Sequence, residues 1–287
     1  MKKKYEESNI QAIAEAIREK TGTENTYDTS EMASGVGEVF EVGKKAGIDE
    51  TKLATWNAIT AYGARVYYAR AFYEGDYTDF VFPKPIKVTG SAGRMFYNYR
   101  GTKLPRKEDI DLSGADVSYT STDDLYSVHN IFGWASKVTF VPDYGIPAAA
   151  RYYLNYNNCS RLVEIEKIRS KETTTWYLPF QGCKALTTLT IEGVIGTDFE
   201  IKDSPLSPAS FKNIIKHLKD YKGTDKDDVY TLTFNGFAWD VFANSGFDDD
   251  DYAWIESKYN VPKDEFISLG VGWQDIVLGL GWNLVFA

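Results

Sequence analysis

The sequence predicts an α+β fold in which a short N-terminal helical module is followed by a β-solenoid with a helix-strand C-terminal cap. Three observations predict it. Apolar residues repeat at a constant spacing between residues 132 and 191. Two short amphipathic helical patterns precede them, within the first 43 residues. A third helical pattern, followed by a strand-like segment, begins after residue 203.

The repeat has a period of 24 residues, and its apolar positions form four columns. Phe132, Tyr156 and Phe180 are 24 residues apart and begin the three copies. One such unit cannot bury its apolar side alone, so a fixed period of this length is typical of stacked units that share a core. The other columns are Ala135, Cys159 and Cys183; Val138, Leu162 and Leu186; and Val141, Ile165 and Leu189. We expect each column to form a ladder of like side chains.

The two cysteines occupy the small position of the repeat. Cys159 and Cys183 would lie about 5 Å apart if neighbouring units are spaced like strands, so a disulfide is one alternative. The third copy fills the position with Ala135, and a free cysteine packs as a small hydrophobic residue. We therefore predict two packed thiols. The chain has no Cys-x-x-Cys motif, and we expect no zinc site.

Residues 1–50 form the predicted helical module. Residues 8–22 read as one helix, and a second begins near Thr29 or Ser30 and ends near Gly43. Helices this short are marginal alone, so we expect them to pair with each other or with copies from other chains. Their apolar stripes, the candidate oligomerisation or attachment residues, are Ile10, Ile13 and Ile17, and Met32, Val36 and Val39.

The rest of the chain divides into three predicted parts. Residues 51–90 are rich in aromatic side chains and read as strands that connect to or cap the repeats. Residues 91–235 hold the repeats, a terminal helix and a strand. Residues 236–287 form a C-terminal capping segment.

Two helix starts are predicted in the C-terminal third. Ser207 is the N-cap of the terminal helix, Pro208 is its first residue, and Gly223 lies just past its end. Residues 248–251 are four consecutive aspartates. They suggest either a calcium site or the N-terminus of a helix, where the dipole favours acidic residues. We predict the helix, because the EF-hand spacing is absent.

Composition argues against several functions. The net charge is −9, from 32 basic and 41 acidic residues, so the chain lacks the basic face of a nucleic-acid-binding protein. No apolar run reaches the roughly 18 residues of a membrane span. Polar residues follow Lys4 where a signal peptide would be apolar. We therefore expect no nucleic-acid partner, no membrane insertion and no secretion by a signal peptide.

The sequence carries no recognisable catalytic motif, and we expect no enzyme, cofactor or metal. The two histidines, His129 and His217, lie in no hydrolase or metalloprotease motif. Glu164 and Glu166 could cleave glycosides in principle. On the outward face of a repeat strand, a solvated charge is the simpler interpretation.

The repeat resembles a known family. Residues 180–189 read Phe-Gln-Gly-Cys-Lys-Ala-Leu-Thr-Thr-Leu, which resembles the BspA type of leucine-rich repeat. Residues 94–99, Arg-Met-Phe-Tyr-Asn-Tyr, resemble its Met-Phe-Tyr-Asn-Cys unit, with Tyr99 in place of Cys. Tyr99 precedes Ala135 by 36 residues, so this interval holds an insertion or an additional coil. The resemblance covers residues 90–235 and implies a leucine-rich-repeat-like solenoid.

The N-terminal module carries a second resemblance. Residues 10–23 read Ile-Gln-Ala-Ile-Ala-Glu-Ala-Ile-Arg-Glu-Lys-Thr-Gly-Thr, and residues 30–33 read Ser-Glu-Met-Ala. These two segments are similar to the N-terminal module of tail-associated proteins from phages and prophages of Gram-positive bacteria. The resemblance implies a virion tail protein, made in the cytoplasm of the bacterial host, that attaches to other tail proteins through this module.

Together these features predict a structural protein of a phage tail tip, fibre or baseplate that binds a glycan or protein of the host cell surface. We expect a homo-oligomer, with a trimer favoured. Alternatives are a tail, baseplate or decoration subunit without a receptor, a bacterial surface adhesin, and a glycan-degrading tail enzyme. The candidate ligand-binding residues are rings outside the repeat columns, although some would instead pack against a neighbouring coil: Trp134, Tyr152, Tyr153, Trp176 and Tyr177.

Overall fold

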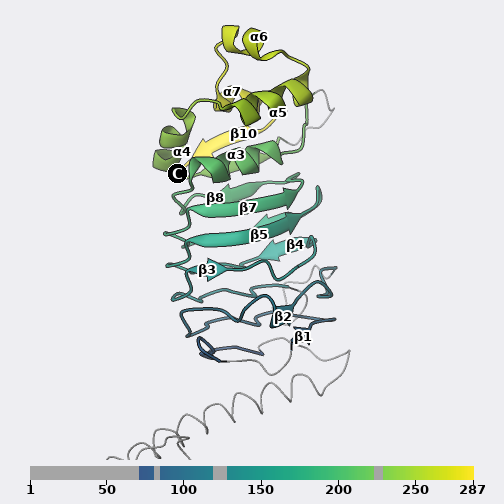
Figure 1. The fold of residues 1–287 in the computed structure, drawn as a ribbon, viewed down its shortest axis with the longest axis vertical. Coiled ribbons are helices and arrows are strands. Elements are labelled where there is room, and N and C mark those ends of the chain that lie inside the picture. Colours follow the sequence, from purple (N-terminus) through teal and green to yellow (C-terminus); the bar gives the residue numbers. More distant parts are fainter. Residues whose placement is uncertain (1–70, 81–84, 119–127, 223–228) are drawn as a thin grey trace, which may run out of the picture. The chain divides into compact units, whose positions relative to one another are not determined.

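The computed structural model describes residues 71–80, 85–118, 128–222 and 229–287, which belong to one compact unit, Ile59–Ala287 (Figure 1). The strands are β1 (Ile86–Lys87), β2 (Ile110–Asp111), β3 (Phe140–Val141), β4 (Arg151–Tyr153), β5 (Glu164–Ser170), β6 (Thr175–Tyr177), β7 (Thr188–Gly193), β8 (Phe199–Ile201), β9 (Thr231–Phe234) and β10 (Asn283–Phe286). The helices are α3 (Pro208–Lys216), α4 (Gly236–Ala243), α5 (Asp249–Tyr259), α6 (Lys263–Ser268) and α7 (Trp273–Gly279). The predicted N-terminal helices lie outside the described residues, as do their stripe residues Ile10, Ile13, Ile17, Met32, Val36 and Val39.

The fold class predicted from the sequence is wrong. The described residues form a mixed α/β structure with four small parallel sheets, ordered β1-β2, β3-β5-β7, β4-β6 and β10-β9-β8, and no solenoid sheet runs through them. One reason lies between β1 and β2, where the segment 102–108 contains Pro105, which has no N–H to donate to a neighbouring strand. The expected helix-strand cap is also too simple, because α4 to α7 precede β10, which pairs with β9.

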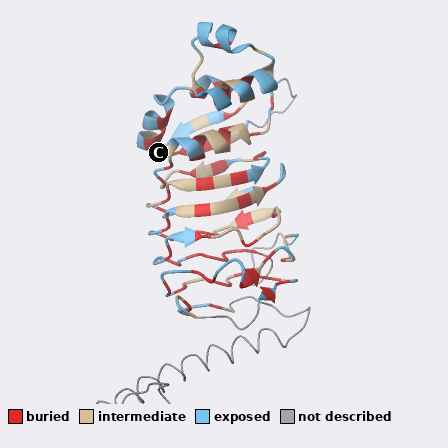
Figure 2. Ribbon diagram, viewed as in Figure 1, coloured by how far each residue is buried: buried red, intermediate tan, exposed pale blue. Residues whose placement is uncertain are grey.

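The aromatic residues that begin successive repeats form one continuous stack of rings. The ring centroids of Phe96 and Phe132 are 5.5 Å apart, those of Phe132 and Tyr156 are 5.3 Å apart, and those of Tyr156 and Phe180 are 5.7 Å apart. Phe72 adds a further ring, 5.2 Å from Phe96. Because Phe96 stacks directly on Phe132, the 36-residue interval contains an insertion and no additional coil. All residues of the four predicted columns are buried, and β5 and β7 alternate buried and part-exposed residues (Figure 2).

The backbone beside each stacked ring makes a tight turn that bonds to the next repeat. The N–H of Phe132 donates to the carbonyl of Asn155 at 2.9 Å, and the N–H of Tyr156 donates to that of Pro179 at 2.9 Å. Two residues after each ring the backbone is left-handed, with positive φ at Glu74, Asn98, Trp134, Asn158 and Gly182. Asn and Gly adopt this conformation readily. Trp134, with φ of 62°, does so at a cost on the order of 1 kcal/mol.

Both cysteines are free and buried, so the prediction of packed thiols is confirmed. The Sγ of Cys159 donates to the carbonyl of Phe132, and the Sγ of Cys183 donates to that of Tyr156, each at 3.0 Å. Burial raises the pKa of Cys159 to about 12 and also raises the pKa of Cys183. Both thiols therefore remain protonated donors inside the stack.

The start of helix α3 is as predicted, and its end is not. Ser207 is the N-cap, its side chain accepts from the N–H of Ser210, and Pro208 is the first helical residue. The helix ends at Lys216, earlier than the predicted end near Gly223. The chain leaves the helix because Leu218 forms a parallel bridge with Ile195.

Helix α3 covers the edge of β7 in the place of a further strand (Figure 1). The N–H of Leu189 donates to the Oγ of Ser210 at 2.9 Å, and the N–H of Ile191 donates to the Oδ1 of Asn213 at 2.6 Å. An unpaired strand edge exposes backbone groups that need partners. Side chains of one helix supply them here.

The four aspartates begin helix α5, as predicted. The Asp248 carboxylate accepts from the N–H of Asp251 at 2.9 Å, and the Asp251 carboxylate accepts from the N–H of Asp248 at 3.0 Å. The Nζ of Lys212 lies 2.6 Å from Asp248 and 2.5 Å from Asp251. The Nζ of Lys216 lies 2.8 Å from the Oδ1 of Asp251, without the alignment of a hydrogen bond. These ion pairs join α5 to α3.

We expect Asp248→Asn to remove an acid-sensitive contribution to stability. Lys212 and the N–H of Asp251 lower the pKa of Asp248 to about 2. In the unfolded chain an Asp pKa is about 3.9, so this carboxylate stabilises the fold above about pH 4 and loses that effect as pH falls toward about 2. Asn is an equally good N-cap, so the substitution removes the charge and keeps the cap. The melting temperature of the wild type should exceed that of the variant at neutral pH, and the difference should shrink in acid. A difference that does not change with pH would contradict this account.

Candidate functional site

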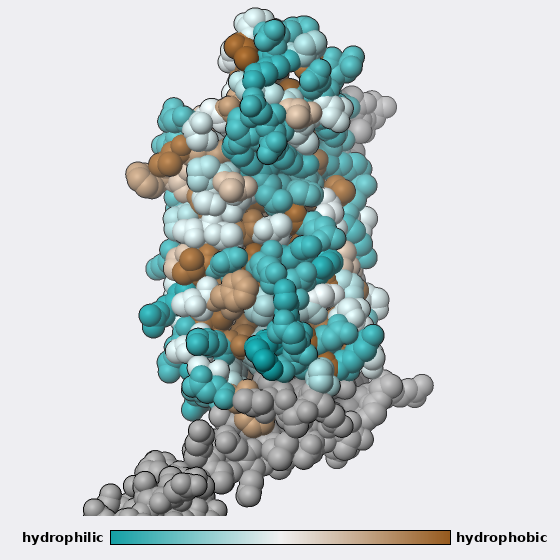
Figure 3. Space-filling model, in the orientation of Figure 1, coloured by the Kyte–Doolittle hydropathy of each residue, from teal (hydrophilic) through white to brown (hydrophobic). Residues whose placement is uncertain are grey.

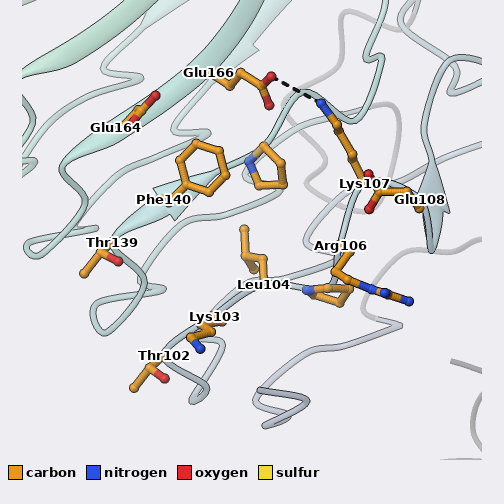
Figure 4. A pocket seen from close by; sticks show the side chains of 12 residues that line it. Thr102, Lys103, Leu104, Arg106, Lys107, Glu108, Thr139, Phe140, Glu164 and Glu166 are labelled. Carbon is orange, nitrogen blue, oxygen red and sulfur yellow. Dashed lines mark hydrogen bonds and ion pairs between the residues drawn. The ribbon is translucent and has the colours of Figure 1, made fainter. Parts of the chain in front are cut away.

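An open hollow of about 500 Å³ lies beside β3, the edge strand of the β3-β5-β7 sheet (Figure 4). Its volume falls within the ~300–1,000 Å³ typical of small-ligand sites. Its apolar lining comes from Leu104, Pro105, Phe140 and Pro142. The remaining lining residues carry charges or hydroxyl groups: Thr102, Lys103, Arg106, Lys107, Glu108, Thr139, Glu164 and Glu166.

The hollow exists because the equivalent segment of the preceding repeat does not pair with β3. Leu104 and Phe140 each follow a stacked ring, Phe96 or Phe132, by eight residues. Phe140 lies in β3 and pairs with β5, whereas the segment 102–108 forms no strand. Figure 4 shows this segment on the opposite side of the hollow from β3, with the side chain of Lys107 reaching across toward Glu166.

Two buried tyrosines hold the wall formed by the segment 102–108. The hydroxyl of Tyr99 accepts from the N–H of Tyr77 at 2.8 Å and donates to the carbonyl of Lys103 at 3.0 Å. The hydroxyl of Tyr144 donates to the carbonyl of Pro105 at 2.5 Å. Burial raises the pKa of both Tyr99 and Tyr144 well above the ordinary value, so both hydroxyls stay protonated. The wall is therefore fixed from inside the protein.

An ion pair fixes the end of this wall. The Nε of Arg106 lies 2.8 Å from the Oδ2 of Asp109, and a second guanidinium nitrogen lies 2.9 Å from the Oδ1. This two-point contact orients the guanidinium. Asp109 is buried, while Arg106 is exposed at the rim of the hollow.

The opposite side of the hollow presents one aromatic ring and two carboxylates. Phe140 is 42 % exposed and pairs in register with Glu164 on the adjacent strand. Glu166 lies two residues along β5, on the same face. Its Oε2 accepts from the N–H of Asp143 at 2.8 Å, and its Oε1 lies 3.4 Å from the Nζ of Lys107. Glu166 is therefore held in place, whereas among the residues that the structure describes the carboxylate of Glu164 has no hydrogen bond or ion pair.

The charges around the hollow balance. The cations are Lys103, Arg106 and Lys107, and the carboxylates are Glu108, Glu164 and Glu166. Two of the cations already have partners, Arg106 with Asp109 and Lys107 with Glu166. The hollow is therefore polar at its rim without a strong field of either sign. An ionic ligand gains little here, because the lining charges of opposite sign are equal in number.

A second ion pair stiffens the strand that carries the carboxylates. The guanidinium of Arg169 in β5 contacts both oxygens of Asp143 at 2.7 Å. The hydrogen bond from Arg169 lowers the pKa of Asp143. The hydroxyl of Tyr152 donates to the carbonyl of Arg169 at 2.7 Å. Asp143, whose N–H holds Glu166, is thus itself anchored.

The five rings predicted as ligand-binding residues lie in three different settings. Tyr152 is 2 % exposed and stacks on Trp176 at 4.8 Å, so this pair packs repeat against repeat. Tyr153 stacks on Tyr177 at 4.7 Å, with Tyr177 45 % exposed. Trp134 is 49 % exposed and lies on one of the left-handed turns. Tyr152 offers no surface to a ligand, and none of the five lines the hollow beside β3.

Tyr153 and Tyr177 form a pair of stacked rings at the surface, beside Arg151. The guanidinium carbon of Arg151 lies 5.1 Å from the Tyr153 ring centre and 5.5 Å from that of Tyr177. A smaller hollow of about 370 Å³ lies beside Tyr177, between β6 and β8. Stacking covers one face of each tyrosine ring, and Tyr177 remains 45 % exposed beside this smaller hollow.

Phe140 and the residues of the wall were not among the binding residues predicted from the sequence. Phe140 precedes the buried column residue Val141, so strand alternation alone places it on the outward face; this signal was available. Leu104, which lines the hollow, and Tyr144, which holds its wall, gave no comparable signal, because their roles depend on the path of the segment 102–108. Glu164 and Glu166 were expected to be solvated, but they are partly buried at the hollow.

The face shown in Figure 3 is mostly hydrophilic, with hydrophobic side chains in small separate groups. Within the described ranges, no cluster of three or more His, Cys, Asp or Glu residues is placed to hold a metal ion. None of the helices in these ranges has the length and apolar character needed to cross a membrane. In comparisons with protein-family models, curated proteins and solved structures, nothing matches this chain.

We expect Tyr144→Phe to loosen the wall of the hollow. The substitution removes the hydrogen bond to Pro105 and leaves a buried carbonyl without that donor, at a cost of about 1 kcal/mol in the free energy of unfolding. Backbone amides in the segment 102–108 should exchange faster with solvent, as measured by hydrogen-exchange mass spectrometry. Tyr153→Phe is the matched control, since the Tyr153 hydroxyl makes no contact with this wall. Equal exchange in the two variants would show that Tyr144 does not hold the wall.

Proposed function

We propose that the protein is a structural protein of a phage tail tip, fibre or baseplate, and that it binds the host cell surface through the hollow beside β3. The tail assignment rests on the resemblance of residues 10–23 to the N-terminal module of phage tail-associated proteins. In this proposal, residues 1–50 attach the chain to other tail proteins or to further copies of itself. The described unit, Ile59–Ala287, then presents the binding face.

The observation that carries the binding role is the fixed wall of the hollow. Tyr99 and Tyr144 hold backbone carbonyls of the segment 102–108, and Arg106 is fixed by Asp109. A site whose groups are already ordered loses little conformational entropy when a ligand binds. Such order around an exposed ring and unpaired polar groups favours a binding surface over a featureless loop.

The arrangement of the carboxylates favours binding over glycoside cleavage. A glycosidase needs one carboxyl group to give a proton to the leaving oxygen and a second to act as base or nucleophile. Both oxygens of Glu166 already accept contacts, from Lys107 and from the N–H of Asp143. These contacts make Glu166 a poor proton donor. The other two lining carboxylates, Glu164 and Glu108, come from opposite walls of the hollow (Figure 4), so cleavage would require one of them as the acid.

We expect Phe140→Ala to abolish adsorption of the purified protein to host cells. The substitution removes the exposed ring from the hollow and leaves the buried columns intact. Phe237→Ala is the matched control, because Phe237 is an 80 % exposed phenylalanine on α4, which does not line the hollow. Adsorption can be measured by fluorescence of labelled protein on cells. Loss in both variants, or in neither, would argue against the hollow as the receptor site.

We also expect the wild-type protein to release no reducing sugar ends from host cell-wall polysaccharide. The reason is the engagement of both Glu166 oxygens described above. A colorimetric assay for reducing ends measures this directly, with Glu164→Gln as the control. Release by the wild type that disappears in Glu164→Gln would replace the binding proposal with a hydrolase.

A further inference from the structure

We propose that the hollow beside β3 binds a neutral pyranose unit of a polysaccharide, with one sugar face on the Phe140 ring and sugar hydroxyls on Glu164. This inference rests on the proposed function, because it takes the hollow to be the binding site. It adds the chemical class of the ligand, for which the sequence left glycan and protein equally open.

The ring supplies the first part of the recognition. A pyranose has an apolar face of C–H groups, and the face of an aromatic ring carries partial negative charge. Phe140 is 42 % exposed at the hollow, with apolar atoms of Leu104, Pro105 and Pro142 around it. A sugar ring can cover Phe140 without exposing or burying any charge.

The carboxylate of Glu164 supplies the second part. It pairs in register with Phe140 on a parallel strand, and neighbouring strands lie about 4.8 Å apart. An ionised carboxylate has two acceptor oxygens and no donor, so it can take hydrogen bonds from two neighbouring sugar hydroxyls. Lys103 and Thr102 on the opposite wall offer donors for the other sugar oxygens.

The charges around the hollow favour a neutral sugar over an ionic ligand. Three cations and three carboxylates surround the hollow, and the Lys107–Glu166 and Arg106–Asp109 pairs are already formed. Because charges of both signs surround the hollow in equal number, neither an anionic nor a cationic ligand meets a net attraction. A neutral polyol uses the remaining acceptors and donors and leaves both pairs in place.

The geometry of β3 argues against an extended peptide. A peptide that adds to a sheet edge gains most of its affinity from backbone hydrogen bonds along the strand. Strand β3 is two residues long, and Pro142, which follows it, has no N–H. Few backbone bonds are available at this edge, so strand addition is a poor use of the hollow.

The test is saturation-transfer NMR with methyl β-D-glucopyranoside, methyl β-D-galactopyranoside and N-acetyl-D-glucosamine as probes, on the full chain. We expect at least one probe to bind with a roughly millimolar Kd, as a ligand of this size allows, and its C–H protons to receive the strongest transfer. Phe140→Ala should weaken binding by about tenfold or more, since stacking and contact area are both lost. Phe140→Tyr should bind like the wild type, and Glu164→Gln should bind more weakly.

Control variants distinguish a loss of sugar binding from a loss of folding. Phe237→Ala should bind like the wild type. Circular dichroism and melting temperature report whether each variant folds, and Phe140→Leu replaces Phe140→Ala if the latter does not. Leu keeps the apolar volume without the ring, so we expect it too to weaken binding.

The outcomes distinguish this inference from the proposed function. If no probe binds, or if binding survives Phe140→Ala, the sugar assignment is overturned, even where cell adsorption still depends on Phe140. If a probe binds through Phe140 but the protein does not adsorb to cells, the sugar site stands and the host-binding function fails. Probe binding and cell adsorption that are both lost in Phe140→Ala support both.

Discussion

The near-constant distance between stacked aromatic rings, 5.2 to 5.7 Å between ring centroids, is the constraint on which the other parts of this structure depend. Each ring from Phe72 to Phe180 stacks on the next, and the adjoining turn donates a backbone hydrogen bond to the following repeat. A ring pair of this kind contributes about 0.5–1.5 kcal/mol beyond its buried area. The stack holds successive turns in one register even though the sheets on either side are short and separate. It also offsets the strain of left-handed residues such as Trp134.

The hollow arises where one segment of the chain lies apart from the neighbouring repeat although the rings beside it remain stacked. Phe96 and Phe132 remain stacked across an interval of 36 residues, so the additional residues must leave the core. The segment 102–108, which occupies the same position in its repeat as β3, lies away from β3 and is held by the hydroxyls of Tyr99 and Tyr144. Tyr99 occupies the position that cysteine fills in later repeats. Its longer side chain reaches the carbonyl of Lys103 in this segment, which a thiol would not, so one substitution in the repeat pattern is tied to the presence of the wall.

Some of this architecture could be predicted from the sequence, because it follows from local chemistry or from a repeated spacing. The buried columns, the free thiols of Cys159 and Cys183, the Ser207 cap and the helix at the four aspartates are of this kind. The fold class was not, since a regular column of apolar residues does not reveal whether the intervening segments pair as strands. The candidate site was also largely missed. The outward position of Phe140 could have been predicted from strand alternation. The contacts of Tyr144 and Leu104 could not, because they join residues whose separation in the sequence does not repeat.

The direction of the turn hydrogen bonds gives the stack an electrical polarity. The N–H groups of Phe96, Phe132 and Tyr156 each donate to a carbonyl of the repeat that follows, so the dipoles of these peptide groups add rather than cancel, as they do along a helix. The C-terminal end of such a column carries unpaired N–H groups and partial positive charge. A carboxylate meets it there: the N–H of Gly182 donates to the Oδ2 of Asp203 at 2.7 Å. Asp203 thus ends the array as an acidic residue ends a helix at its N-terminus. Adding another repeat at this point would require the removal of that charge as well as the addition of a ring.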